Sequence, residues 1–299
     1  MMDIDANIRR RSGKLVLPAA LLVMALLFLF PLLLTIADSF MSEQEIKNSY
    51  GMVTSRDSSR EDNAFSGKYA DVRFIPAMAT VEQYYTALIQ RTQFLIKFWN
   101  SVIITVPIIL GQVVVASMAA YAFAKLDFAF RDPLFFTYII VMMMPFQVTL
   151  VPNYIIAGKL GLTGSYLSII LPGVFGTFGV FLLRQFMVYL PDAYIEAAKV
   201  DGASDFGIFS RVVLPMSKTG LAALSILVFI DNWNMVEQPL IFLQDVNKHP
   251  LSIYLSSINQ GELGIAFAAS TIYMLPMLLV FLYGENYLVQ GIQLSGLKG

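Results

Sequence analysis

Long apolar runs separated by polar segments dominate this chain of 299 residues and predict membrane-spanning helices. A bilayer hydrocarbon core about 30 Å thick requires about 20 apolar residues in one helix. Six stretches have this length, namely 15–37, 100–124, 133–155, 165–188, 219–243 and 264–288. Because backbone in contact with lipid must satisfy its own hydrogen bonds, each stretch is predicted to be a helix, kinked where it contains proline. The sequence therefore predicts an all-α integral membrane protein with six transmembrane helices.

Positive charge predicts the orientation of these spans. Arg9, Arg10, Arg11 and Lys14 precede the first span, and basic clusters in this position stay in the cytoplasm. The first apolar run is longer than the core of a signal peptide, and no small-residue cleavage site follows it, so we expect it to remain as a span. With six spans, both termini are then cytoplasmic, and the polar segment 190–217 is cytoplasmic as well.

The predicted spans divide the chain into four parts. These are a cytoplasmic N-terminus at 1–14, the first transmembrane helix at 15–37, an extracytoplasmic segment at 38–99, and a core of five transmembrane helices at 100–299. Residues 41–79 are polar and mixed in charge, which is typical of an irregular loop. Thr80 and Gln83 have the spacing of a capping box, and apolar residues at helical intervals follow them. This pattern predicts an interfacial helix that seals the outer rim or receives a soluble partner.

Composition excludes several classes of function. The chain is 57% hydrophobic and only 14% charged, which favours lipid as its main solvent, and its net charge of -1 gives no sign of nucleic-acid binding. It has no cysteine and a single histidine, His249, so neither metal clusters nor most acid–base chemistry can be assembled. We therefore predict a chain that is not an enzyme, without a metal site, and a His249 that is solvated in the last outer loop.

The polar segment between the fourth and fifth predicted spans has the signals of two short helices. A helix over about 193–200 ends at Gly202, which can adopt the left-handed conformation. Ser204 is a candidate N-cap for the second helix, with Asp205 in its first turn, and Pro215 is predicted to end that helix. Two short helices joined by a tight turn form a stiff projection. The residues alone also allow an amphipathic pair lying on the inner leaflet.

Several motifs of this chain occur in the same order in one family. Glu196-Ala-Ala-x3-Gly202 with Val213-Leu-Pro215 resembles the EAA loop of the membrane subunits of binding-protein-dependent ABC importers. Other segments resemble motifs of the carbohydrate branch, at Met144–Pro152, Gly161–Tyr166, Phe181–Phe186, Asp231–Asn234, Pro239–Leu243 and Gly296–Gly299. The chain is most similar to the smaller permease of maltose-transporter-like pairs, and this resemblance implies a type I ABC importer permease fold in a bacterial or archaeal inner membrane.

The resemblance also implies the partners and the coupling residues. An importer of this kind contains a second, homologous permease, two ATPase subunits or domains, and an extracytoplasmic solute-binding protein. This chain has no G-x-x-x-x-G-K-[ST] loop, so ATP and Mg are expected on the partner ATPase and no cofactor on this chain. The residues implied to couple to the ATPase are Glu196, Ala197, Ala198, Asp201, Gly202 and Pro215.

Polar residues within the predicted spans are candidates for a translocation path, because groups of this kind at membrane depth face a bundle interior or a watery cavity. The candidates are Gln147, Asn153, Tyr154, Asp231, Asn232, Trp233 and Asn234. Amides with neighbouring aromatic rings suit a hydroxyl-rich solute, so the cargo is predicted to be a carbohydrate, in particular an oligosaccharide. For each residue alone, interhelical packing is the alternative. Glu237 is unusual for the family at its position.

Two other functions are compatible with a polytopic chain. An importer for glycerol phosphodiesters or polyamines is the first, although anionic cargo demands basic residues that the spans lack away from their ends. An ATP-independent secondary transporter is the second, and it would be expected to show an internal repeat or paired broken helices. The sequence contains no convincing repeat.

Overall fold

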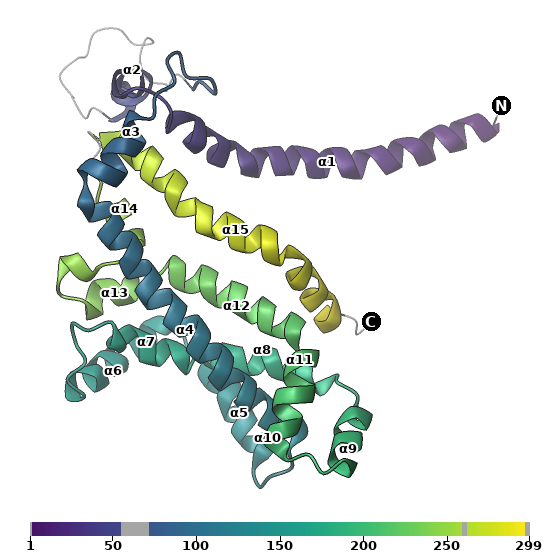
Figure 1. The fold of residues 1–299 in the computed structure, drawn as a ribbon. Helices are drawn as coiled ribbons and strands as arrows, with labels where there is room; N and C mark the ends of the chain where they lie inside the picture. Colours follow the sequence, from purple (N-terminus) through teal and green to yellow (C-terminus); the bar gives the residue numbers. More distant parts are fainter. Residues whose placement is uncertain (1, 55–71, 259–261, 297–299) are drawn as a thin grey trace. The chain divides into compact units, whose positions relative to one another are not determined.

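A computed structural model describes residues 2–54, 72–258 and 262–296, and all secondary structure in these ranges is helical. The chain divides into two compact units, which are described separately (Figure 1). The first unit comprises Met1–Thr92 with Ser257–Tyr273, and the second comprises Gln93–Ser256 with Met274–Gly299. The all-α prediction is confirmed for the described residues.

The first unit contains α1 (Met2–Asp38), α2 (Glu43–Thr54), α3 (Glu82–Tyr85), a π-helical turn (Thr86–Gln90) and the first turns of α15 (Leu263–Gly296). The expectation of an irregular loop over 41–79 is wrong for α2, while residues 55–71 lie outside the described part. The predicted capping box is also wrong. The Thr80 hydroxyl accepts from the amide of Glu82, and the Thr80 amide donates to the Phe40 carbonyl rather than to a Gln83 side chain.

The second unit contains the remaining helices. They are α4 (Thr92–Lys125), α5 (Arg131–Met142), α6 (Phe146–Lys159), α7 (Leu167–Val174), α8 (Thr177–Val188), α9 (Asp192–Val200), α10 (Asp205–Ile208), a π-helical turn (Phe209–Val213), α11 (Leu214–Met216), α12 (Lys218–Trp233), α13 (Glu237–Phe242), a 3-10 turn (Val246–Lys248), α14 (Leu251–Ser256) and the rest of α15.

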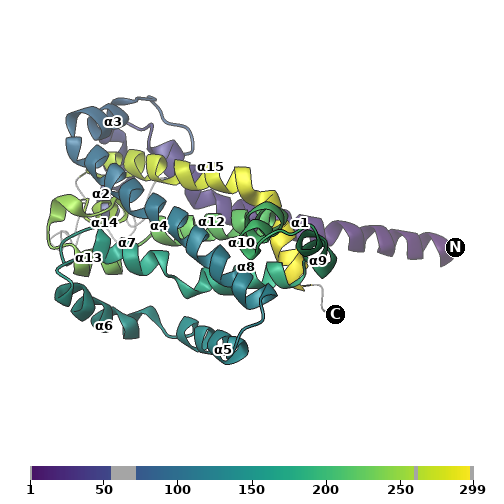
Figure 2. The same ribbon diagram turned by 60° about the horizontal axis from the view of Figure 1, so that its bottom comes forward.

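Four of the six predicted spans agree with helical segments long and apolar enough to cross a membrane. Among the described residues these are Leu17–Asp38, Thr92–Lys125, Leu167–Val188 and Leu263–Leu288. The other two predictions, 133–155 and 219–243, are wrong as continuous helices. The first is divided between α5 and α6, which are bent by 101° (Figure 2). The second is divided between α12, which ends at Trp233, and α13.

Both breaks have local features that favour the end of a helix. Pro145 precedes α6 in an extended conformation and has no amide hydrogen to continue a helix from α5. After α12, Pro239 has no amide hydrogen for the Met235 carbonyl, and that carbonyl accepts a 2.6 Å hydrogen bond from the Ser252 hydroxyl instead. The first break therefore lies at a proline, whereas Pro239 lies inside α13, beyond the end of α12.

Small residues let the helices of the second unit approach closely. A Cβ on Gly179 of α8 would lie 3.0 Å from the Ala116 Cβ of α4, and one on Gly220 of α12 would lie 2.7 Å from the Phe186 Cγ of α8. Close approach at small residues is a common basis of helix packing in membranes. These contacts fix α4, α8 and α12 against one another and so fix the base of the 190–217 loop.

A hydrogen-bonded cluster joins the beginning of α4 to the loop before α14. The Asn100 amide nitrogen donates to the carbonyls of Asn247 (2.6 Å) and His249 (3.0 Å), and its oxygen accepts from the Tyr166 hydroxyl (2.8 Å). Burial raises the pKa of Tyr166, and the charge of Asp245 raises it further, so this hydroxyl remains a proton donor. The Gly161–Tyr166 motif thus has a structural role here.

The prediction of a solvated His249 is wrong. Its side chain is buried, and its Nε2 lies 2.8 Å from the carbonyl oxygen of Leu243. A buried imidazole requires a partner of this kind, because an unpaired polar group in the interior costs free energy. The residue therefore serves to hold the loop after α13.

Candidate functional site

The first half of the 190–217 loop is a helix closed by a glycine turn. The predicted helix is present as α9, and Gly202 has the predicted left-handed conformation with φ +80°. The amide of Gly202 donates to the Lys199 carbonyl and the amide of Ala203 to the Ala198 carbonyl, each at 3.0 Å. This pair of bonds is the Schellman arrangement, which satisfies carbonyls that the helix end would leave unpaired. The turn is thereby fixed in direction.

The second half of the loop begins as predicted and ends differently. The Ser204 hydroxyl accepts from the Gly207 amide at 3.2 Å, so it caps α10, and Asp205 occupies the first turn. The prediction that Pro215 ends this helix is wrong, because a π-helical turn and α11 carry the helical path through Pro215 to Met216. The bend lies at the next residue, Ser217, and measures 75°.

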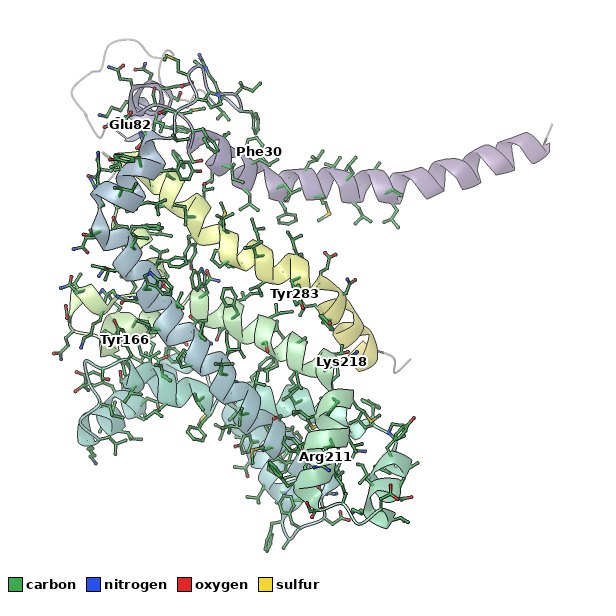
Figure 3. All side chains as sticks on the ribbon, viewed as in Figure 1. Phe30, Glu82, Tyr166, Arg211, Lys218 and Tyr283 are labelled. Carbon is green, nitrogen blue, oxygen red and sulfur yellow. The ribbon has the colours of Figure 1, made fainter. Side chains whose placement is uncertain are left out.

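The π-helical turn explains why a proline is tolerated there. Within an α-helix, proline lacks one hydrogen bond and its ring contacts the carbonyl four residues earlier. Here the Leu214 amide donates to the Phe209 carbonyl five residues earlier, which widens the helix just before Pro215. Figure 3 labels Arg211 in this turn and Lys218 at the start of α12, on either side of the bend.

Apolar side chains fix both halves of the loop to the second unit. Ile195 of α9 is buried, as are Ile208, Phe209 and Val213 on the second half. The ring of Phe209 lies 5.4 Å from that of Tyr121 on α4. These four side chains belong to the same core as α4 and α8. The loop is therefore a packed projection of the second unit and not an independent amphipathic pair.

The structure groups most of the predicted coupling residues on the outside of this projection. Glu196, Ala197, Asp201 and Gly202 are exposed along α9 and its turn, and Ala198 is half-buried against the core. Pro215 is exposed too, but it lies on α11 beyond the π-helical turn.

Three exposed apolar residues of the loop were missed by sequence reasoning. Val200 is 88% exposed, Phe206 68% and Tyr194 56%. Their exposure on a polar loop makes these side chains candidates for contact with another protein. The sequence did contain a signal for these residues. Only one face of each short helix can be buried, and the loop has more apolar residues than these two faces need.

The candidate path residues of α6 lie near α13. Gln147 is exposed, and its amide nitrogen donates to the Glu237 carboxylate at 3.3 Å. Asn153 is half-buried, and Tyr154 packs edge-on against Phe242 with ring centroids 5.5 Å apart. The structure thus brings Gln147 together with Glu237.

The candidates on α12 divide into accessible and packed groups. Asp231 and Asn234 are exposed, whereas Trp233 is buried between the rings of Phe98 and Phe229. The side-chain amide of Asn232 donates to the Val228 carbonyl, and that of Asn234 to the Ile230 carbonyl, both at 2.8 Å. Trp233 therefore acts as a packing residue within this chain, with no open face for a sugar ring. The described residues contain no group of three or more metal-ligating side chains.

Several membrane-spanning helices and a stiff loop built into their core define a polytopic membrane protein with a surface for a further protein. Residues 90–293 match the family described as "Binding-protein-dependent transport system inner membrane component". The chain belongs to this family. It is a non-catalytic, multi-pass inner membrane permease of an ABC importer, and ATP is handled by another subunit.

Named relatives agree with this assignment. The arabinooligosaccharides transport system permease protein AraQ of Halalkalibacterium halodurans is 30% identical over 76% of this chain and 82% of its own length. The sn-glycerol-3-phosphate transport system permease protein UgpE of Pectobacterium atrosepticum is 34% identical over 67% of this chain and 73% of its own. A solved bacterial ABC transporter involved in import of the acidic polysaccharide alginate shares the fold, with TM-score 0.77, 21% identity and coverage of 93% and 96%.

Proposed function

We propose that the 190–217 loop is the cytoplasmic surface through which an ATPase drives this permease, and that the cargo is a neutral oligosaccharide. The importer would contain a second homologous permease, two ATPase subunits or domains and an extracytoplasmic solute-binding protein. The observation that carries the proposal is the stiff, core-anchored loop with three exposed apolar side chains, Tyr194, Val200 and Phe206.

The coupling role follows from the stiffness of the loop. A push on α9 cannot be absorbed by the turn, because Gly202 is held by the bonds that close the helix. Ile195 and Phe209 carry the displacement into the core of the second unit. Closure of an ATPase dimer would then tilt the spans and expose the path alternately to each side of the membrane. Glu196 and Asp201, exposed beside the apolar residues, would meet basic groups of the ATPase.

The cargo class is supported by the chemistry of the accessible polar residues. Gln147, Asn153 and Asn234 are carboxamides, and Asp231 and Glu237 are carboxylates. Hydroxyl groups find both donors and acceptors in such a set, whereas a phosphate or uronate would meet negative charge. Of the two relatives described above, AraQ is named for arabinooligosaccharides and UgpE for sn-glycerol-3-phosphate. The residues of this chain favour the neutral cargo.

The coupling proposal is tested by variants of the exposed apolar residues. Val200→Asp and Phe206→Ser are expected to abolish co-purification of the ATPase from detergent-solubilised membranes, because a desolvated apolar contact is lost. Phe130→Asn is the matched control, since Phe130 is also strongly exposed but lies between α4 and α5. Retained ATPase in both loop variants, at wild-type stoichiometry, would contradict the docking surface.

The cargo proposal is tested by competition in proteoliposomes that contain the complete importer and its binding protein. Uptake of a labelled neutral oligosaccharide should fall when unlabelled neutral oligosaccharides are added. It should be unaffected by equal concentrations of sn-glycerol-3-phosphate or oligouronates. Inhibition by the anionic solutes alone would overturn the assignment and leave the coupling proposal intact.

A further inference from the structure

Lys125, the last residue of α4, holds the entrance of the 190–217 loop. Its ammonium group donates to the Leu190 carbonyl (2.6 Å), the Val188 carbonyl (3.4 Å) and the Asp192 carboxylate (2.7 Å). The Lys125 side chain is 5% exposed, although its partner Asp192 is 73% exposed. A lysine so covered is unusual, and these bonds fix the chain on both sides of Pro191, where α9 begins.

A second contact joins the same face of α4 to the other half of the loop. Tyr121 lies four residues before Lys125, so the two side chains share one face of the helix, and Tyr121 packs on Phe209. Nearby, the Arg184 guanidinium of α8 donates to the Phe123 carbonyl at 3.3 Å. The end of α4 therefore contacts the loop at its entrance and at its π-helical turn.

The opposite end of α4 is held to a different loop by a comparable set of bonds. The ammonium group of Lys97, a buried residue, donates to the Val246 carbonyl, and the Ser101 hydroxyl accepts from the Leu251 amide at 2.8 Å. Asn100 binds the same segment through two carbonyls. Lys97, Asn100 and Ser101 share one helix face, because they are spaced by three and four residues.

A single continuous helix, α4, thus connects two loops at opposite ends of the second unit, and Pro107 lies within it between the two sets of contacts. Twenty residues separate Ser101 from Tyr121, and at 1.5 Å per residue this corresponds to about 30 Å, the thickness of a bilayer core. Figure 1 shows α4 extending from the region of α13 and α14 to that of α9 and α10. An uninterrupted helix of 34 residues joins the two sets of contacts.

We propose that Lys125 is a positioning residue that makes α4 the link between the 190–217 loop and the 243–251 segment at the other end of the helix. The proposal rests on the proposed coupling role of the loop. Displacement of the loop by the ATPase then moves α4 as a unit, and α4 moves the 243–251 segment with it. In the reverse direction, a binding protein acting on the outer side signals to the ATPase along the same helix.

The test compares Lys125→Met with Lys159→Met in the reconstituted importer. Lys159 is also the last residue of its helix, α6, but it is exposed, and its side chain makes no hydrogen bond or ion pair within the described part of the chain. Lys125→Met should keep the ATPase bound and its basal activity unchanged, because the exposed apolar residues of the loop remain. Uptake and the stimulation of ATPase by loaded binding protein should fall about tenfold or more, as expected for loss of a charge-assisted anchor.

Conservative variants separate positioning from a general packing defect. Lys125→Arg should restore both readouts. Asp192→Asn should have little effect, because the amide oxygen of the replacement can still accept the hydrogen bond from Lys125 and the lost charge is largely screened by solvent. Normal uptake in Lys125→Met would overturn the inference while leaving the docking surface in place. Loss of ATPase binding in Lys125→Met would overturn it too, because Lys125 would then shape the docking surface. If the docking variants Val200→Asp and Phe206→Ser retain the ATPase, the proposed coupling function is refuted, whatever the result with Lys125→Met.

A cross-linking variant keeps the inference testable if Lys125→Met assembles poorly. The chain has no native cysteine, so a Lys125→Cys/Asp192→Cys pair can be joined selectively by a short bifunctional thiol reagent. The uncoupled pair should transport as weakly as Lys125→Met, and cross-linking should restore most of the uptake. Full cross-linking without recovery, in a complex that retains its ATPase, would refute the link.

Discussion

Replacement of Gly202 isolates the backbone contribution of the glycine turn. The residue has φ +80°, and a Cβ built on it has no neighbouring atom within 4 Å. Gly202→Ala therefore introduces no steric clash with the rest of the molecule. Its only cost is the left-handed conformation, about 1–2 kcal/mol for a residue with a Cβ. This corresponds to a decrease of about 5-fold to 30-fold in the population of the native turn relative to its alternatives.

The assay is uptake by proteoliposomes, together with ATPase stimulation by the loaded binding protein. In Gly202→Ala, uptake and ATPase stimulation should both fall by up to this factor of about 5-fold to 30-fold. In Gly202→Val they should fall further, because a β-branched residue is still less tolerant of positive φ. Gly202→Asn should retain most activity, since asparagine adopts this conformation more readily. Equal activity of the Val, Ala and Asn variants would refute the argument that turn geometry determines coupling.

Replacement of a second glycine, Gly220, should produce a packing defect between helices rather than a defect in turn geometry. A Cβ on Gly220 would lie 2.7 Å from the Phe186 ring, so Gly220→Ala forces helices α8 and α12 apart. Overpacking of this kind costs about 1–3 kcal/mol and should lower the melting temperature of the solubilised chain. Gly202→Ala should lower that melting temperature less, because the exposed turn can rearrange locally to relieve its strain of about 1–2 kcal/mol. Uptake measured well below both melting temperatures then distinguishes a coupling defect from instability.

Two further predictions concern polar contacts away from the loop. Asn100→Leu should lower the melting temperature in detergent, since three hydrogen bonds worth about 0.6 kcal/mol each are lost. Asn153→Leu should not, because the Asn153 side chain makes no hydrogen bond to any described residue. In the first unit, hydrogen bonds from Arg91 lower the pKa of Glu262. The pair therefore stabilises the folded protein above the usual glutamate pKa, and this stabilisation is lost as the pH falls through the lowered pKa. Thermal unfolding of Glu262→Gln should accordingly be less sensitive to acid than that of the wild type; equal acid sensitivity would contradict the assignment.

Hydropathy predicted which segments are apolar enough for a membrane, but not where their helices break. The break at Pro145 occurs inside apolar sequence, so a transfer scale assigns one continuous span there. The end of α12 at Trp233 lies in the polar stretch Asp231–Asn234, which the predicted span 219–243 included because apolar residues flank it on both sides. Local signals performed better in the 190–217 loop. Gly202 and Ser204 act through bonds to residues within five positions, and both were predictable for that reason.

Contacts between distant residues were the part that sequence did not reveal. Lys125 is an ordinary basic residue at the end of a span until the fold brings Leu190 and Asp192 to its ammonium group. His249 likewise has no sequence signal for burial, because its partner carbonyl at Leu243 is presented by the turn after α13. Each depends on tertiary placement, which local patterns do not contain.

Polar side chains in and near the spans fall into two groups, those that bind backbone carbonyls and those that do not. Gln112 donates to the Gly176 carbonyl where α7 and α8 separate, and Ser252 to the Met235 carbonyl beyond α12, so both repair breaks in the helical backbone. Such repair is required because an unpaired carbonyl is costly in a membrane. The exposed side chain of Asp231 makes no hydrogen bond to another described residue, and a carboxylate at membrane depth avoids lipid. We therefore propose Asp231 as a cargo contact in preference to Asn232 and Asn234, whose side-chain amides already bind backbone carbonyls.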